Sequence, residues 1–133
     1  MEVTVSSGHG VRMMSDAATV LKTRIRADLT AAMKRRANDE TRLLRALLAA
    51  LDNAEAVSVG TAHDRYQVRM FGDSSVEVPR RVLSEADIRD LLSRETAERD
   101  AAAQEFERLN QQSEADRLRN EITLIARYAT HFR

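Results

Sequence analysis

Residues 41–56 read TRLLRALLAALDNAEA, and this stretch decides the fold class of the chain. Its apolar positions are Leu43, Leu44, Leu47, Leu48, Leu51 and Ala54. Spacings of three and four residues place them in one arc of an α-helix, because each residue turns the helix by about 100°. Alanine and leucine also have high helix propensity. The stretch therefore predicts an amphipathic helix with a strong apolar face.

The residues before this stretch predict another amphipathic helix, from Ser15 to about Arg36. Its apolar stripe consists of Leu21, Ile25, Leu29, Ala32 and Met33. Ser15 or Asp16 can cap its start, and Asn38 or Asp39 offers a stop and an N-cap for the next helix. Because the connection is short, we expect the two helices to be antiparallel neighbours.

The residues after Val82 repeat this arrangement. Ser84, followed three residues later by Asp87, is a weak form of the capping box and predicts the start of a third helix. Its stripe consists of Ile88, Leu91, Leu92, Ala102, Phe106 and Leu109. Ser113 is expected to cap a fourth helix, with the stripe Ala115, Leu118, Ile122, Ile125 and Ala129. Amphipathic helices bury their stripes against one another, so the sequence predicts an all-α fold of two packed helical hairpins, in one domain over residues 15–133.

A long insertion, residues 57–82, is expected between the second and third helices, because two of the four glycines and the single proline fall there. Tyr66, Val68 and Met70 alternate with polar residues, and a Gly-Asp-Ser-Ser segment separates them from residues 76–78. The insertion is either an irregular surface segment or a small β-hairpin, and the sequence leaves both interpretations open.

The composition narrows the class of protein. The chain has 133 residues and no cysteine, which excludes disulfides and cysteine-based zinc sites and fits a reducing compartment. No run approaches the roughly 18 apolar residues of a membrane span, and the N-terminal region lacks the apolar segment of a signal peptide. We therefore expect a cytoplasmic protein without membrane association. Residues 1–14 are expected to be a disordered tail, with Met13 or Met14 as an alternative start.

Charge is unevenly distributed although 21 lysines and arginines balance 21 aspartates and glutamates. Residues 22–45 carry eight basic against three acidic side chains, an excess of five positive charges. Residues 85–121 carry eleven acidic against six basic side chains, an excess of five negative charges. The zero net charge counts against strong nonspecific binding of nucleic acid and leaves room only for a local contact.

A cluster of cations brackets the first inter-helix turn and is the candidate binding site of the chain. Its members are Lys34, Arg35, Arg36, Arg42 and Arg45. Such a cluster can contact RNA phosphates. It can also be a solvated helix end, where cations offset the helix dipole.

The sequence lacks the residues that most known kinds of catalytic site require. His9, His63 and His131 have no partner at the spacing of metal ligands. The sequence has neither a glycine-rich phosphate loop nor a GxSxG nucleophile motif. We therefore expect no catalytic residues, no metal and no cofactor, and a chain that is not an enzyme on its own.

Charged residues within the apolar stripes predict a polar network. Glu95 and Arg99 lie four residues apart, in line with the stripe of the third helix, and Glu55 lies in the stripe of the second. An isolated buried charge is costly, so these groups should pair with one another or with other partners. The network is either a structural ion-pair cluster at the rim of the core or a polar recognition spot in a groove between helices.

The order of helical positions resembles that of a known family. In the first half of the chain it consists of Leu21-Lys22, Asp28, Ala32-Met33-Lys34, Leu44-Arg45, Leu47-Leu48, Ala50-Leu51, Asn53 and Glu55. In the second half, LSEADI at residues 83–88 is followed by Glu95, Arg99, Phe106-Glu107, Glu121, Ile125 and Tyr128. Over about residues 20–128 this pattern is similar to YqeY-like proteins, which share a domain with the B subunit of the tRNA-dependent glutamine amidotransferase.

The resemblance implies an all-helical domain linked to the transamidation of misacylated tRNA. In the amidotransferase the chemistry lies elsewhere, and the shared helical domain is associated with tRNA contact. This chain departs from the family at Tyr128-Ala129-Thr130, where relatives usually read Tyr-Leu-Pro and continue into a small helical subdomain. The insertion of residues 57–82 is also longer than the family pattern.

Three functions follow from these expectations. The first is a non-catalytic helical adaptor of YqeY type, which binds tRNA weakly or binds a translation-related protein. The second is a protein-interaction module, for example a homodimer in which the acidic half of one copy docks on the basic turn of another. The third is a component of a carbon–nitrogen ligase with glutamine as amide donor, active only within a larger complex.

Overall fold

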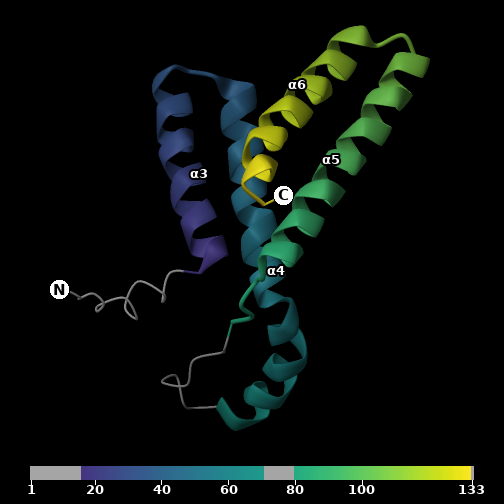
Figure 1. The fold of residues 1–133 in the computed structure, drawn as a ribbon. Helices are drawn as coiled ribbons and strands as arrows, with labels where there is room; N and C mark the ends of the chain where they lie inside the picture. The colour runs from purple at the N-terminus through teal and green to yellow at the C-terminus, as the bar shows by residue number, and fades with distance from the viewer. Residues whose placement is uncertain (1–15, 71–79, 133) are drawn as a thin grey trace, which may run out of the picture.

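The computed structural model describes residues 16–70 and 80–132, and every regular element in these two ranges is helical. The elements are α3 (Ala17–Lys34), α4 (Asn38–Met70), α5 (Glu85–Arg108), α6 (Gln112–Ala129) and a short 3-10 helix, η1 (Thr130–Phe132). α3 packs along α4, and α5 packs along α6. The second hairpin leans away from the first toward its outer end (Figure 1). The all-α fold of two packed helical hairpins is therefore confirmed.

The leucine stripe of residues 41–56 forms the centre of the core. Its most deeply buried members are Leu43, Leu44, Leu47 and Leu51. The same cluster takes in large side chains from each of the other three long helices: Ile25, Ile88, Leu92 and Ile125. Burying one such side chain contributes about 2 kcal/mol. One shared core thus joins both hairpins.

The two hairpins meet through the C-terminal end of the chain. The end of α6 and η1 lie against α4 and the beginning of α5. The Tyr128 hydroxyl donates to Asp28 of α3 at 2.5 Å, and Arg89 of α5 donates to the main-chain carbonyl of Phe132 at 2.7 Å. The first of these bonds joins the two hairpins directly, and the second holds η1 against α5.

Two helix starts agree with the sequence. The Asp16 side chain accepts a hydrogen bond from the Thr19 N–H at 2.8 Å and caps α3. Ser84 and Asp87 form a full capping box at the start of α5, with both bonds at 3.0 Å. A cap of this kind satisfies main-chain N–H groups that the first helical turn leaves without partners.

The other two starts differ from the prediction. Asn38 is already helical, since the carbonyl of Ala37 accepts the first hydrogen bond of α4, from Thr41. Ser113 is likewise inside α6, which follows Gln111 without a side-chain cap. The reason lies in the turns that precede these helices.

Both hairpin turns close with the same Schellman motif. After α3, Arg36 takes a positive φ of 60°, and the Ala37 N–H donates to the Ala32 carbonyl at 2.9 Å. After α5, Asn110 takes a φ of 62°, and the Gln111 N–H donates to the Phe106 carbonyl at 2.8 Å. The residue that closes each motif leads directly into the next helix, so no separate capping residue fits.

α4 extends further than the sequence indicates. The structure continues it to Met70, through the first part of the expected insertion, so residues 66–70 are helical and do not form a strand. A single glycine such as Gly60 costs a helix only about 1 kcal/mol, and a five-residue alternation is too short to outweigh continued helix propensity. The rest of the predicted hairpin, residues 71–78, lies outside the described residues, as does the expected tail of residues 1–14.

Candidate functional site

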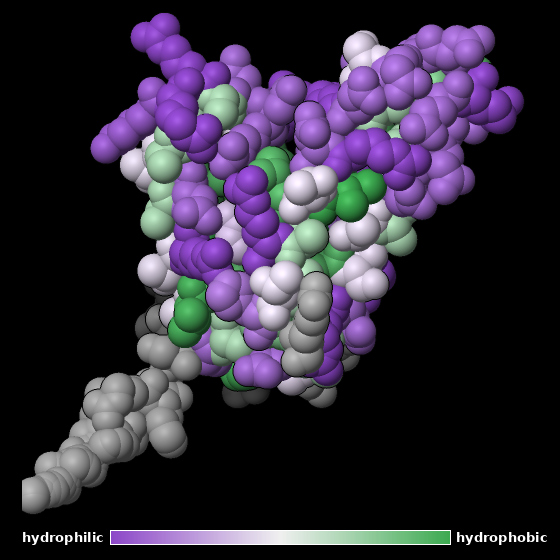
Figure 2. Space-filling view, turned by 45° about the horizontal axis from the view of Figure 1, so that its top comes forward, coloured by the Kyte–Doolittle hydropathy of each residue, from purple (hydrophilic) through white to green (hydrophobic). Residues whose placement is uncertain are grey.

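The five cations of the predicted site lie on or beside the turn between α3 and α4, and we call them the basic turn. Lys34, Arg35, Arg36, Arg42 and Arg45 are all exposed. Figure 2 shows that hydrophilic side chains cover the ends of both hairpins on the face it presents. The structure thus brings all five predicted residues to one end of the molecule.

Two members of the basic turn already have acidic partners. Arg35 contacts Glu40 at 3.1 Å, and Arg42 contacts Asp39 at 3.5 Å. Arg42 and Asp39 are both largely exposed, so their pair contributes little to stability, whereas Glu40 is only 22% exposed beside the exposed Arg35. Lys34, Arg36 and Arg45 form no ion pair with any residue that the structure describes.

A small polar pocket lies next to the basic turn, between α3, the start of α4 and α6. It has a volume of about 260 Å³, and Arg24, Asp28, Arg35, Glu40, Arg127 and Tyr128 supply its polar lining. Burial and the hydrogen bond to Asp28 raise the pKa of Tyr128 well above its ordinary value. The guanidinium of Arg24 lies 5.3 Å from the centre of the Tyr128 ring, in reach of a cation–π contact.

The predicted pair of Glu95 and Arg99 is in contact, and a second carboxylate, that of Glu121, joins it from α6. Arg99 contacts Glu95 and Glu121, each at 2.8 Å, and Arg117 contacts Glu121 at 2.9 Å. Burial lowers the pKa of Arg99, but its hydrogen bonds to Glu121 and Glu95 outweigh that effect and raise it. Sequence reasoning missed the part that Glu121 plays, because Glu121 meets Arg99 only when α5 and α6 fold together.

Glu55, the third member predicted from the sequence, lies in a separate cluster. Its carboxylate contacts Lys22 of α3 at 2.7 Å and Arg80 at 3.1 Å, and its main-chain carbonyl accepts from the Arg81 N–H at 2.8 Å. Burial lowers the pKa of Lys22, while hydrogen bonds to Glu55 and Asp52 raise it by more. The shared apolar arc indicated burial for Glu55 but could not indicate which helix covers it.

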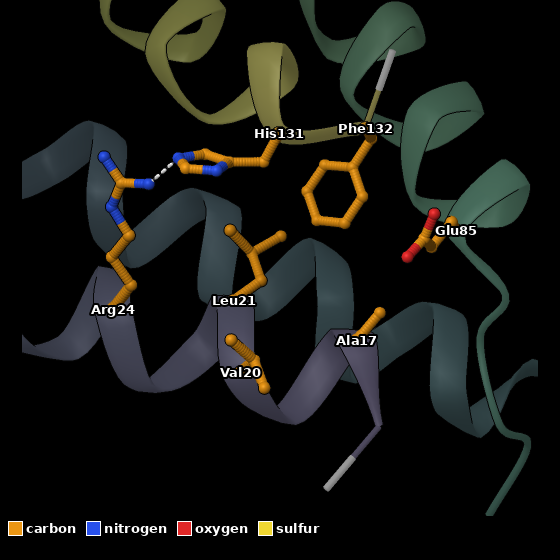
Figure 3. Close-up of a pocket in the computed structure, with 7 residues that line it drawn as sticks. All are labelled: Ala17, Val20, Leu21, Arg24, Glu85, His131 and Phe132. Atoms are coloured by element: carbon orange, nitrogen blue, oxygen red, sulfur yellow. Dashed lines mark hydrogen bonds between the residues drawn. The ribbon is translucent and has the colours of Figure 1, made fainter. Parts of the chain in front are cut away.

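A second pocket, of about 500 Å³, lies at the opposite end of α3 and is mainly apolar. Figure 3 shows Val20, Leu21, Ala17 and Phe132 around it, with Arg24 at one end and Glu85 at the other. The guanidinium of Arg24 is hydrogen-bonded to the ring of His131. Val20 is 58% exposed, so this pocket offers apolar surface to a partner.

Among residues 16–56 and 80–132, whose side chains the structure describes, no group of three or more acidic or histidine side chains is placed to bind a metal ion. None of the helices in residues 16–70 and 80–132 is both long and apolar enough to cross a membrane.

No family model matches the chain, and no curated protein matches it. The similarity to YqeY-like proteins therefore remains a prediction from the sequence.

Proposed function

We propose that this protein is a non-catalytic helical adaptor of YqeY type that binds RNA, with tRNA as the first candidate, through the basic turn. The observation that carries the proposal is the exposure of all five cations at one end of a helical hairpin. Each contact between a cation and an RNA phosphate releases condensed counterions, which drives binding. The hairpin holds the cations on adjoining helix ends, so few of their positions need to be ordered when RNA binds.

The arrangement of charge suits a weak and local contact. The acidic side chains of the second hairpin keep the net charge of the chain at zero, so no long-range field gathers RNA around the whole molecule. Few aromatic side chains are present to stack on bases, because aromatic residues make up only 4% of the chain. The proposed contact is therefore to the phosphate backbone, which positions the RNA without reading its sequence.

A matched pair of triple variants tests the proposal in a gel-shift titration with tRNA. The first variant neutralises Lys34, Arg42 and Arg45 to glutamine, and the control neutralises the exposed Arg26, Arg94 and Arg108. Arg36 is left intact because its φ of 60° shapes the turn, and Arg35 because it also lines the polar pocket.

We expect the first variant to bind tRNA more weakly than the control does. The slope of log K against log salt should fall by about 0.7 for each RNA phosphate that the variant no longer neutralises, or roughly 2 in total. Equal binding by the two variants would remove the basic turn as the site. No binding by the unchanged protein would remove RNA as the partner.

A second candidate function is favoured by the apolar pocket of Figure 3. A translation-related protein, or a second copy of this chain, can place an apolar side chain against Val20 and Phe132. Substituting Val20 by Asp should then abolish capture of that partner while leaving tRNA binding unchanged, since Val20 lies on α3 far from its C-terminal turn.

A further inference from the structure

The polar pocket between α3, α4 and α6 gathers three guanidinium groups from separate parts of the chain. Arg24 lies in the middle of α3, Arg35 directly follows it, and Arg127 belongs to the last turn of α6. Only the packing of the two hairpins brings these three together. The sequence gives no sign of this cluster, because Arg24 and Arg127 are about a hundred residues apart.

The two carboxylates of the pocket are already engaged by other groups. Asp28 accepts the hydrogen bond from the Tyr128 hydroxyl at 2.5 Å, and Glu40 is paired with Arg35 at 3.1 Å. Arg24 lies over the Tyr128 ring and is hydrogen-bonded to a ring nitrogen of His131, and neither group carries a negative charge. Arg127 has no ion-pair partner among the described residues. With three cations against two anions, the pocket keeps an excess of positive charge.

The size of the pocket selects a compact ligand. Its volume of about 260 Å³ lies below the roughly 300–1,000 Å³ of sites that enclose a drug-sized molecule. A compact oxyanion can therefore enter the pocket and contact its guanidinium groups. Guanidinium groups present several N–H donors in one plane and bind phosphate oxygens in pairs, so phosphate is the oxyanion that suits them best.

We propose that this pocket binds a phosphate group, held by Arg24, Arg35 and Arg127. The phosphate belongs either to an RNA chain or to a small phosphorylated molecule, and both sources present the same chemistry. If the phosphate belongs to RNA, the inference rests on the proposed function, because Arg35 is shared between the pocket and the basic turn. The phosphate site itself does not depend on RNA binding.

NMR titration of the full chain at constant ionic strength tests the proposal, with inorganic phosphate, adenosine 5′-monophosphate and adenosine as probes. We expect saturable shifts at the amides around Asp28, Glu40 and Tyr128 with the first two probes and none with adenosine. Arg127→Gln should weaken phosphate binding on the order of tenfold, because it removes a charge-assisted contact. Arg26→Gln, which removes an exposed cation on α3 outside the pocket, should leave binding unchanged.

Two outcomes would overturn the phosphate site: no saturable shift with either phosphate probe, or equal weakening by Arg127→Gln and Arg26→Gln. Competition then identifies the source. If a 5′-phosphorylated RNA displaces inorganic phosphate, the site is assigned to RNA. If it does not displace inorganic phosphate, the site is assigned to a small phosphorylated molecule.

The triple variant of Lys34, Arg42 and Arg45 separates this inference from the proposed function. It should retain inorganic phosphate in the pocket with unchanged affinity even though it binds tRNA more weakly. If unchanged protein binds phosphate but no tRNA, the RNA proposal fails and the phosphate site stands.

Discussion

At the scale of single residues, Glu121 is the carboxylate that links the arginines of the polar network in the second hairpin. Its side chain is only 7% exposed and accepts from both Arg99 and Arg117. Glu121→Ala leaves Arg99 partly buried with Glu95 as its single partner. Removing one member of a buried ion pair costs about 3 kcal/mol, so we expect a decrease of that size in the free energy of urea unfolding.

The exposed Glu98 provides the control for this substitution. Glu98→Ala should change the free energy of unfolding by less than about 0.5 kcal/mol, the range of ordinary surface substitutions. Equal effects of the two substitutions would show that the network contributes nothing beyond its surface charges.

Tyr128 makes the stability of the fold depend on pH in the alkaline range. Its pKa is raised above the usual value of about 10 by burial and by Asp28, so the folded chain keeps a proton that the unfolded chain loses. The stabilisation is complete below pH 10 or so and is lost as the pH rises further. Tyr128→Phe should cost about 2 kcal/mol near pH 7, since it removes a hydrogen bond to a charged group.

The difference in stability between unchanged protein and Tyr128→Phe should shrink as the pH rises above about 10. Phenolate absorbance in a Tyr66→Phe background reports the ionisation directly, because Tyr128 is then the single tyrosine. A titration midpoint at or below the ordinary pKa of tyrosine would contradict the contact between Tyr128 and Asp28.

At the scale of elements, substitutions at the helix starts test the observed caps of α5 and α6. Ser84→Ala removes the side-chain acceptor at the start of α5 and should cost about 1 kcal/mol. Ser113→Ala, inside the first turn of α6, should change stability by less than about 0.5 kcal/mol. Urea unfolding of the two variants measures both. A larger effect of Ser113→Ala than of Ser84→Ala would support the helix cap that the sequence predicted at Ser113.

The helices also show most clearly which features of the fold can be predicted from the sequence. Four helices and most of their buried stripes follow from spacing, because a helix repeats its faces regardless of what covers them. Met33 and Leu109, both expected in a stripe, are instead 49% and 50% exposed, because they lie at the ends of their helices beside the hairpin turns. The starts of α4 and α6 were wrong by one or two residues, since a Schellman turn leaves Asn38 and Ser113 inside the helices. Contacts such as Arg99 with Glu121 needed the tertiary structure, because local periodicity does not indicate which helices meet.

At the scale of the whole molecule, the opposite charges of the two hairpins suggest head-to-tail docking of two copies. Many acidic side chains of the second hairpin already form ion pairs within the chain. Those in ion pairs are Asp87, Glu95, Asp100, Glu105, Glu107, Glu114 and Glu121. Fewer acidic groups are left to attract the basic turn of another copy.

We therefore expect light scattering to give a mass near 15.0 kDa at both low and high salt. Exposed ion pairs between copies would be strengthened at low salt, where screening is weak. A doubled mass at low salt that returns to 15.0 kDa at high salt would favour self-docking over the monomeric adaptor.

The outer end of the second hairpin has a small core of its own, built from Ala103, Ala115 and Leu118 with Ala102 and Phe106 against them. This cluster is separate from the leucine core that joins both hairpins. Protein segments with few buried apolar contacts open at a lower free energy than the global unfolding reaction. Amides near Ala103 and Ala115 should thus lose protection from hydrogen exchange before those near Leu47, and the hairpin tip then behaves as a cooperative unit of its own.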